Sequence, residues 1–459
     1  GDWGKPSPDN PWFLVDCPHE PWCWGNTFDQ DSPYTHNLFN SITEHWLTEY
    51  KFDGFRFDFT KGFTNVQTGN QGSDYDAARI ANLKRIADHV WEVSPNAHVI
   101  LEHLTANNEE KELAEYGMQL WGNMNHSYNE ASMGWIDDLN DGSNFEWISY
   151  KERGWSTPHV VGYMESHDEE RLMYRNLEYG NSTGPNHDIK TLEVALERQK
   201  LVGAFFFTIP GPKMIWQFGE LGYDYSINYC PNGTINNECR TSRKPVRWDY
   251  YDDSDRKELY KTWAELIALR KDLSVFKTDN FSLSLEGTGK IITLLHEDMD
   301  VLIVGNFDVT EETVDINFPS TGTWYEYFTQ SEITVESTTQ SFDLQPGEYR
   351  IYSNEYIDRD NYIVSAPVTE PNSKAMGIKV WPNPTTGNLS ISLNLETEQN
   401  VNVNIADING RIVSSVYQGK LSKEEHLFQW SKPKNLSAGI YFLLLNGDFG
   451  KMVERIVIY

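Results

Sequence analysis

Apolar and amphipathic segments alternate along residues 52–273, which predicts β-strands that alternate with α-helices. Strands are expected over 52–58, 98–104, 118–124, 159–164 and 213–218, and helices over 74–93, 108–116, 192–207 and 255–273. Residues 1–45 lack a helical period and are expected to form an irregular loop that ends in a short helix over 41–50. Residues 125–158 are mixed and turn-rich, and we assign no element to them. The alternation over 52–273 favours a parallel sheet, most simply a barrel, in a domain over residues 1–273.

After residue 273 the pattern changes to short strands in which apolar and polar residues alternate. Five such strands are expected, over 281–285, 291–296, 301–307, 313–318 and 349–352, so residues 274–353 predict a small β-sandwich. Residues 354–375 are polar, contain two prolines and predict a linker. The alternation returns in 376–459, with a turn at Asn409 and Gly410, and predicts a second all-β sandwich domain.

The stretch 52–63, FDGFRFDFTKGF, carries charged side chains on a strand that otherwise reads as buried. Because side chains alternate faces along a strand, Arg56 and Asp58 share one face, and Phe55 and Phe57 share the other. Charged groups on a packed face are costly unless they have partners or a chemical role. Taken alone, this pair is explained by a structural ion pair.

Two further acidic residues, Glu102 and Asp168, stand near the ends of later expected strands. In a parallel barrel the C-terminal ends of different strands supply side chains to one site. We therefore expect Asp58, Glu102 and Asp168 to converge. Three such acids, each with a basic neighbour, are hard to explain as packing alone.

Paired carboxylates that face a neutral substrate suggest glycoside hydrolysis. A retaining reaction uses one ionised carboxylate as nucleophile and one protonated carboxyl group as acid, about 5–5.5 Å apart. Arg56 favours the ionised form of Asp58, which makes Asp58 the expected nucleophile. Glu102 is then the expected general acid/base, with a pKa that neighbouring negative charge raises.

The charge of the chain narrows the class of partner. Its 68 acidic and 38 basic residues give a formal net charge of -30 and a pI near 4.7. Such a surface repels nucleic acid and anionic membranes and favours a neutral or cationic partner. Aromatic residues form 14% of the chain, and their flat faces suit sugar rings as well as a core. There is no run of eighteen apolar residues, so no transmembrane segment is expected.

The four cysteines form two local couples, Cys17 with Cys23 and Cys230 with Cys239. Each couple would close a short loop as a disulfide in an oxidising compartment, and free thiols in a cytosolic protein are the alternative. Neither couple has the ligand spacing of a zinc site.

Three short motifs resemble those of the α-amylase family of glycoside hydrolases (family 13). They are GFRFD at 54–58 with Lys61, the strand that ends in Glu102, and ESHDEER at 165–171. The segment WQFGE at 216–220 is also similar, and the resemblance spans about residues 30–353.

This resemblance implies a role for each acid. Asp58 corresponds to the nucleophile and Glu102 to the general acid/base, while Asp168 would hold sugar hydroxyls and stabilise the transition state. Substrate-binding residues are implied beside them: Arg56, His167, Lys61 and His103.

The sequence departs from the family pattern at two points. Leu101 stands where the family usually has a glycine before its acid/base. The third-strand motif, an Asp…Asn-His pattern that supplies a substrate-binding histidine and often a calcium ligand, is absent upstream. Three βα units need about 90 residues, but Asp58 has only 57 before it. We therefore expect a TIM barrel that lacks its first three strands and retains strands 4 to 8, in a fragment of a longer gene product. By resemblance calcium is a possible cofactor; none is required, and we assign no metal ligands.

The last segment, 376–459, resembles the C-terminal sorting domain of type IX secretion, which exports proteins across the outer membrane of Bacteroidetes-type bacteria. Its motifs are VWPNP at 380–384, DINGR at 407–411 and LSAGIY at 436–441. A carbohydrate-binding sandwich is the alternative. The resemblance implies an extracellular or outer-membrane-surface protein, the type IX machinery as a partner, and disulfides at both cysteine couples.

These features predict a retaining glycoside hydrolase that cleaves α-1,4-glucosidic bonds in α-glucan polysaccharides such as starch or glycogen. One alternative is a transglycosylase such as a branching enzyme, in which a sugar hydroxyl replaces water. Another is a non-catalytic surface starch-binding protein, against which the intact Asp58, Glu102 and Asp168 argue.

Overall fold

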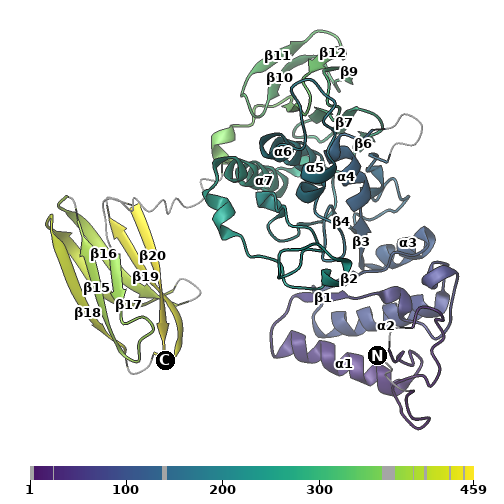
Figure 1. Cartoon of the computed structure of the whole chain (residues 1–459), viewed down its shortest axis with the longest axis horizontal. Coiled ribbons are helices and arrows are strands. Elements are labelled where there is room, and N and C mark those ends of the chain that lie inside the picture. The colour runs from purple at the N-terminus through teal and green to yellow at the C-terminus, as the bar shows by residue number, and fades with distance from the viewer. Residues whose placement is uncertain are drawn as a thin grey trace. The chain divides into compact units, whose positions relative to one another are not determined.

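The structure is a computed structural model and describes residues 5–23, 25–136, 142–363, 378–395, 397–407, 411–433, 436–447 and 450–459. The chain divides into two compact units, Gly1–Val364 and Ser365–Tyr459, and each is described by itself (Figure 1). No helix in the described part is long and apolar enough to cross a membrane.

A curled parallel sheet organises the first unit. Its strands lie in sequence order: β1 (Gly54–Phe57), β2 (His98–Leu101), β3 (Gln119–Asn123), β4 (Val160–Tyr163) and β5 (Lys213–Met214). Every pair of neighbours is parallel, so the C-terminal ends of the strands all meet at one edge. The α-helices of the described part of this unit are α1 (Pro33–Thr48), α2 (Ala77–Val93), α3 (Asn107–Tyr116), α4 (Asn125–Met133), α5 (Leu172–Tyr179), α6 (Leu192–Phe207) and α7 (Ser254–Asp272). Helices connect successive strands, as the sequence predicted for a parallel sheet.

The first helix differs from the expectation. α1 covers Pro33–Thr48, whereas a short helix over 41–50 was predicted. The helix begins early because the Ser32 side chain accepts a hydrogen bond from the backbone N–H of Tyr34, and Pro33 fits the first helical position. The helices α4 and α5 were not predicted, and β5 is only two residues long where a strand over 213–218 was expected.

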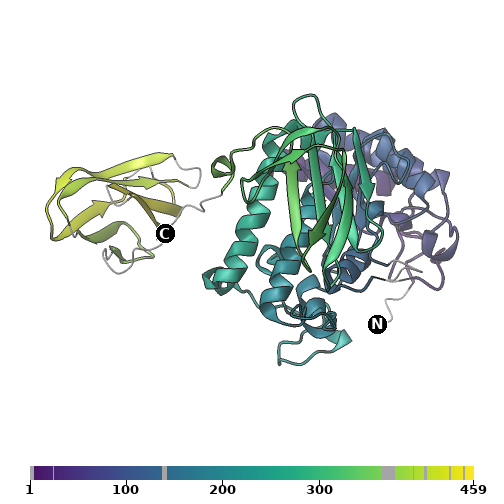
Figure 2. The same cartoon turned by 90° about the horizontal axis from the view of Figure 1, so that it is seen from above.

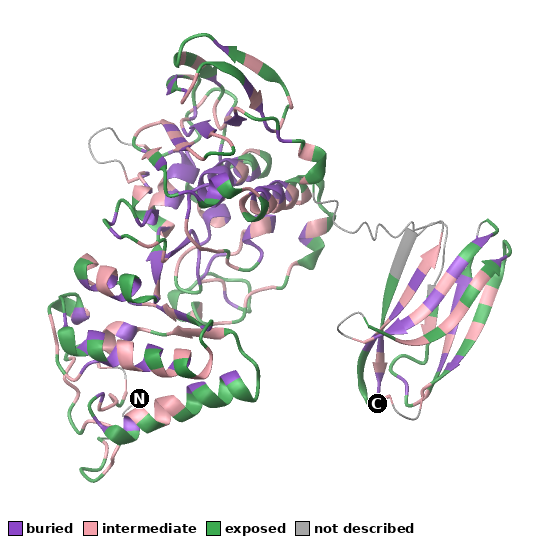
Figure 3. Ribbon diagram, turned by 180° about the vertical axis from the view of Figure 1, so that it is seen from behind, coloured by how far each residue is buried: buried purple, intermediate pink, exposed green. Residues whose placement is uncertain are grey.

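The core of the first unit extends beyond the parallel sheet. α6 is buried on almost every side, because it lies between the parallel part and an antiparallel sheet that follows it (Figure 3). Its Arg198 is fully buried and donates to the carbonyl oxygens of Ala131 and Phe307, which ties the two parts together. At Gly305 a Cβ would come within 2.7 Å of the Phe205 ring, so this position allows the sheet to approach α6 closely.

The antiparallel part contains a six-stranded sheet, β11-β10-β13-β8-β7-β6, and a two-stranded sheet, β12-β9 (Figure 2). The expected strands are present as β6 (Phe281–Ser284), β7 (Gly289–Leu294), β8 (Val301–Asn306), β9 (Glu312–Asn317) and β13 (Tyr349–Ser353). Three strands were not predicted: β10 (Gly322–Glu326), β11 (Glu332–Val335) and β12 (Thr339–Leu344). β11 and β12 were missed because their residues are largely exposed or polar, so little apolar alternation marks them.

The expected linker over 354–375 is packed at its start. Arg359 forms an ion pair with Glu265 of α7 at 2.9 Å, and Ile357 is buried in the core. The segment 354–363 therefore belongs to the first unit, and residues 364–375 lie outside the described residues.

The second unit is an all-β sandwich with its own apolar core. One sheet contains β14 (Ile378–Trp381), β15 (Asn388–Asn394) and β18 (Glu425–Ser431), and the other contains β17 (Ile412–Leu421), β16 (Gln399–Ala406), β19 (Gly439–Gly447) and β20 (Gly450–Ile458). The expected turn at Asn409 and Gly410 lies outside the described residues.

Candidate active site

Asp58 and Glu102 occupy equivalent positions at the ends of two neighbouring strands. Phe57 of β1 pairs with Leu101 of β2, so each acid directly follows the last paired residue of its strand. The backbone N–H of Glu102 donates to the carbonyl oxygen of Phe57 at 3.0 Å. Since neighbouring strands lie about 4.8 Å apart, the two carboxylates extend from the same edge of the sheet.

Arg56 connects these two carboxylates. Its guanidinium group forms an ion pair with Asp58 through one terminal nitrogen and with Glu102 through the other. The strand pattern predicted its proximity to Asp58, but the second ion pair was not foreseen. The guanidinium carbon also lies 4.1 Å from the centre of the Trp121 ring of β3, a cation–π contact that fixes its plane.

The environments of the two acids differ. The Asp58 side chain is 75% exposed, whereas that of Glu102 is 14% exposed and accepts a hydrogen bond from the backbone N–H of Phe59 at 3.1 Å. Burial raises the pKa of Glu102, and the Asp58 carboxylate adds to this, while the Phe59 N–H and Arg56 oppose it. The raised pKa agrees with the expected direction, but burial rather than neighbouring negative charge is its main cause. This asymmetry suits one ionised and one protonated carboxyl group.

Asp168 follows β4 on the same edge of the sheet. Its carboxylate forms an ion pair with Arg240 and lies 3.5 Å from Nε2 of His167. The Ser166 hydroxyl oxygen accepts a hydrogen bond from the Asp168 backbone N–H at 3.1 Å. The His167 ring packs against Trp121, with the ring centres 6.1 Å apart. Trp121 therefore contacts both Arg56, which pairs with Asp58 and Glu102, and His167, which lies beside Asp168.

Lys61 and Asp58 both line a pocket of about 240 Å³. The pocket is formed by the turn after β1 and by the segment that the Cys17–Cys23 disulfide closes, and its walls include His19, Trp22 and Phe28. Burial lowers the pKa of Lys61. The second cysteine couple, Cys230–Cys239, is also a disulfide, so both expected pairings are confirmed.

His103 is not available to a substrate, contrary to the expectation. Its side chain is fully buried, with Nε2 2.8 Å from a Glu109 carboxylate oxygen and Nδ1 2.9 Å from the Thr60 hydroxyl. Glu109 in turn pairs with the equally buried Arg79 at 2.6 Å. His103 therefore supports the turn that follows β1 rather than lining the site.

Three residues near the acids were missed by the sequence analysis. Tyr163 is buried inside the sheet, and its burial, together with the negative charges of Glu169 and Glu102, raises its pKa well above the ordinary value. Glu169 accepts a hydrogen bond from the Asn123 side-chain amide at 2.5 Å, and burial raises its pKa. Glu169 directly follows Asp168 in the acidic motif, which was a readable signal, whereas Arg240 is distant in sequence from every residue of the site.

The described residues contain no group of three or more His, Cys, Asp or Glu side chains that could hold a metal ion. The calcium ion that the resemblance allows therefore has no such set of donors here, and no chemical step below is routed through a metal.

Comparisons with known proteins concern the overall fold and the second unit. Residues 379–459 match the family described as the secretion system C-terminal sorting domain. Among solved structures, an α-amylase from Geobacillus thermoleovorans complexed with acarbose is 14% identical, with a TM-score of 0.55 over 77% of this chain and 71% of that chain. An α-amylase from Anoxybacillus is 16% identical, with a TM-score of 0.54 over 74% of this chain and 70% of that chain.

A cyclomaltodextrinase is 17% identical, with a TM-score of 0.52 over 72% of this chain and 50% of that chain. No curated protein matches the sequence. At these identities the likeness shows the fold. The chain thus combines the fold of α-amylase-type glycosidases with a type IX C-terminal sorting domain, which directs its export to the cell surface or beyond.

Proposed function

We propose that this protein is a retaining α-glucan glycoside hydrolase that cleaves α-1,4-glucosidic bonds in starch- or glycogen-type polysaccharides. The observation that carries the proposal is the arrangement of Arg56 between Asp58 and Glu102 at the ends of two adjacent parallel strands. The α-amylase-type fold of the neighbouring structures supports the substrate class.

In the proposed reaction Asp58 attacks the anomeric carbon while Glu102 donates a proton to the leaving glycosidic oxygen. The exposed carboxylate of Asp58 is accessible to a polymer, and the raised pKa of Glu102 keeps it available as an acid. Glu102 then removes a proton from the water that releases the sugar with retained configuration. Asp168, with His167 beside it, would hold hydroxyl groups of the same sugar and stabilise the positive charge of the transition state.

We further propose that β1 to β5 correspond to strands 4 to 8 of a (β/α)8 barrel within a catalytic domain over 1–273. Their consecutive parallel order and the acids at their C-terminal ends support this correspondence. A β-sandwich domain over 274–353, a linker within 354–375 and the sorting domain over 376–459 complete the proposed organisation.

The test uses the complete gene product, because among the described residues β1 and β5 each have a neighbouring strand on one side only. Reducing-sugar release from soluble starch is measured together with iodine staining and product branching, and compared with the Asp58→Asn and Glu102→Gln variants. We expect the parent protein to release reducing sugar and both variants to release none. New branch points with little release would instead identify a transglycosylase, and starch binding without either signal would identify a binding protein.

A further inference from the structure

A loop closed by a disulfide reaches the candidate site from the segment that follows β5. Cys230 and Cys239 are bonded, and the backbone N–H of Cys230 donates to the carbonyl oxygen of Thr234 at 2.7 Å. Cys230 is buried, whereas residues 231–238 form an exposed tip. The base of the loop is thus fixed while its tip faces solvent.

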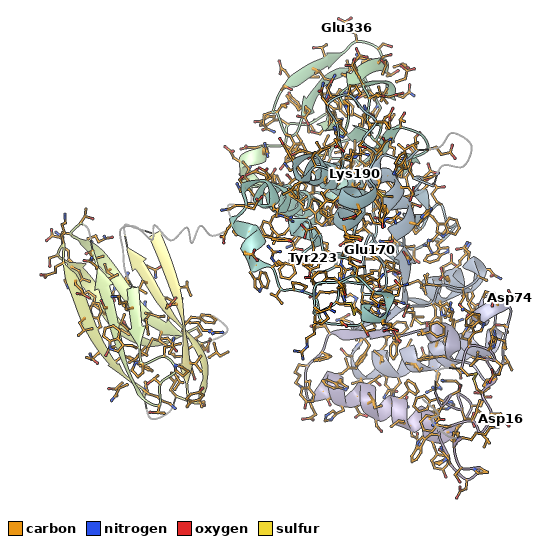
Figure 4. The ribbon with its side chains drawn as sticks, viewed as in Figure 1. Asp16, Asp74, Glu170, Lys190, Tyr223 and Glu336 are labelled. Atoms are coloured by element: carbon orange, nitrogen blue, oxygen red, sulfur yellow. A yellow bond between two sulfur atoms is a disulfide. The ribbon has the colours of Figure 1, made fainter. Side chains whose placement is uncertain are left out.

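Contacts on both sides fasten this loop to the acidic motif after β4. The Glu170 carboxylate accepts hydrogen bonds from the Ser226 hydroxyl at 2.6 Å and from the Ile227 backbone N–H at 2.7 Å. The Tyr223 hydroxyl donates to the carbonyl oxygen of Pro245 at 2.6 Å. Glu170 and Tyr223 lie in the same region of the first unit (Figure 4). The loop is therefore anchored two residues away from Asp168.

The loop presents Arg240 to Asp168. Arg240 directly follows Cys239. The disulfide holds the Cys239 side chain, and the Cys239 carbonyl oxygen accepts a hydrogen bond from Lys244 at 2.8 Å, so the chain just before Arg240 is fixed at two points. Its guanidinium group forms the ion pair with Asp168, and the two side chains remain 49% and 38% exposed. An ion pair this exposed contributes little to stability. Its position is better explained by what it offers to a ligand.

The two partners offer complementary hydrogen-bonding groups. The Asp168 carboxylate only accepts hydrogen bonds, and the Arg240 guanidinium group only donates them. Neighbouring hydroxyl groups of a sugar both donate and accept, so one ring can bind the acid and the base together. The guanidinium group has five N–H donors, and its exposed surface leaves some of them free to reach a ligand.

We propose that Arg240 is a substrate-binding residue that donates a hydrogen bond to a hydroxyl oxygen of the glucosyl unit held by Asp168, and that the Cys230–Cys239 loop positions it there. This inference rests on the proposed function and adds a specificity-determining contact to it. According to this inference, the affinity for neutral α-glucans depends on Arg240, which lies 72 positions from Asp168 in sequence.

The test measures binding of maltoheptaose to the complete gene product by calorimetry, in the Asp58→Asn background so that the ligand is not cleaved. Adding Arg240→Ala is expected to weaken binding by roughly 10- to 100-fold, the range for loss of a hydrogen bond to a charged group. Arg240→Lys keeps the charge and one donor direction, so it is expected to retain part of the affinity. Arg243→Ala is the matched control, because Arg243 lies on the same loop and is exposed.

A second pair of measurements distinguishes the effect of the loop that positions Arg240 from the effect of its guanidinium group. The double variant Cys230→Ser/Cys239→Ser keeps Arg240 but releases the loop, and it is expected to weaken binding in the same direction. In otherwise unmodified protein, Arg240→Ala is expected to raise KM for maltoheptaose more than it lowers kcat.

The outcomes are distinguishable from those of the proposed function. If Arg240→Ala binds maltoheptaose as tightly as Arg243→Ala, or more tightly, Arg240 is a structural or obstructing residue and the inference is wrong, while the hydrolase proposal stands. If the parent protein neither binds nor cleaves maltoheptaose, the proposed function fails and the inference fails with it.

Discussion

The backbone N–H of Thr60 donates to the carbonyl oxygen of Glu102 at 2.9 Å, so the turn after β1 holds the end of β2. The Thr60 hydroxyl lies 2.9 Å from the same oxygen and 2.9 Å from Nδ1 of His103, and its single proton serves only one of them. Burial lowers the pKa of His103, which favours the neutral ring. Its Nε2–H then donates to Glu109, which leaves Nδ1 to accept the proton of Thr60.

The first prediction concerns the buried ion pair beneath this turn. Arg79 and Glu109 have fully buried side chains, and Glu109→Gln leaves the Arg79 charge without its partner. Removing one member of a buried pair costs about 3–5 kcal/mol, so we expect the free energy of unfolding of the first unit to fall by about that amount at pH 7. Urea unfolding followed by fluorescence measures it.

The pH dependence of this cost has a definite sign. Burial alone raises the pKa of Glu109, but the hydrogen bonds from His103 and Arg79 outweigh it, so the pKa lies below the ordinary value. The stabilisation is therefore present above the unfolded pKa of about 4.3 and is lost as the pH falls through the folded pKa. Glu112→Gln is the control, because its pair with Lys84 is partly exposed, and it is expected to cost less than about 1 kcal/mol. Equal costs for the two variants would contradict the argument.

The second prediction concerns the protonation of Glu102. A general acid must be protonated, and burial raises the pKa of Glu102, so kcat/KM is expected to fall on the basic side at a pH above the ordinary glutamate pKa of about 4.3. Arg56→Gln removes a cation that opposes this shift, so the basic limb of the remaining activity should move to higher pH. The measurement is the pH profile of kcat/KM on a maltooligosaccharide.

Maltosyl fluoride provides the control for that profile, because its leaving group needs no proton. With this substrate the basic limb is expected to disappear or weaken. A basic limb that is the same for both substrates would mean that Glu102 is not the general acid.

Much of the scaffold can be predicted from local pattern. α6 covers the expected residues 192–207, and its second half, 201–207, is a continuous apolar stretch that is buried. The start of α1 also had a local signal, since Ser32 and Pro33 suit an N-cap and a first helical position. The exposed strands β11 and β12 had no comparable signal, because their apolar residues are too few.

The site is predictable only where the relevant contact is local. Alternation along β1 correctly puts Arg56 beside Asp58, but the ion pair of Arg56 with Glu102 depends on the register between β1 and β2, which the sequence does not reveal. The same alternation rule explains why His103 does not line the site. If the Glu102 side chain faces the site, the side chain of the next residue, His103, faces away from it. Arg240 reaches Asp168 through a loop that follows β5, so only the structure brings the two together.

The third prediction concerns Glu165, which is the first residue of the acidic motif at 165–171 and is buried. Burial raises its pKa, and Arg171 and a hydrogen bond from the Leu172 backbone N–H oppose this shift. A carboxyl group with a raised folded pKa contributes stability that is complete below the unfolded pKa and is lost as the pH rises through the folded pKa. Glu165→Gln cannot ionise and is therefore expected to gain stability relative to the parent between about pH 4 and pH 7. Each unit by which folding raises the pKa of Glu165 corresponds to a gain of about 1 kcal/mol in the free energy of unfolding of the variant.

Thermal unfolding of both proteins at several pH values measures this gain. Glu178→Gln on α5 is the control, because Glu178 is exposed, and it should show no such trend. A difference between the Glu165→Gln variant and the parent that does not change with pH would mean that packing, not ionisation, governs this position.

The last prediction concerns the sorting domain. The second unit has its own apolar core, which includes Ile391 of β15 and Val403 of β16 and is separate from that of the first unit. Deleting residues 379–459 is therefore expected to leave the unfolding temperature of the first unit unchanged within about 2 °C, while export to the cell surface or medium is lost. Immunodetection in the cell and medium fractions of a host with type IX secretion measures the loss of export.

A reporter protein fused to residues 365–459 should be exported from the same host and retained in a strain that lacks the type IX machinery. If the variant that lacks residues 379–459 is exported as efficiently as the parent protein, another part of the chain directs secretion.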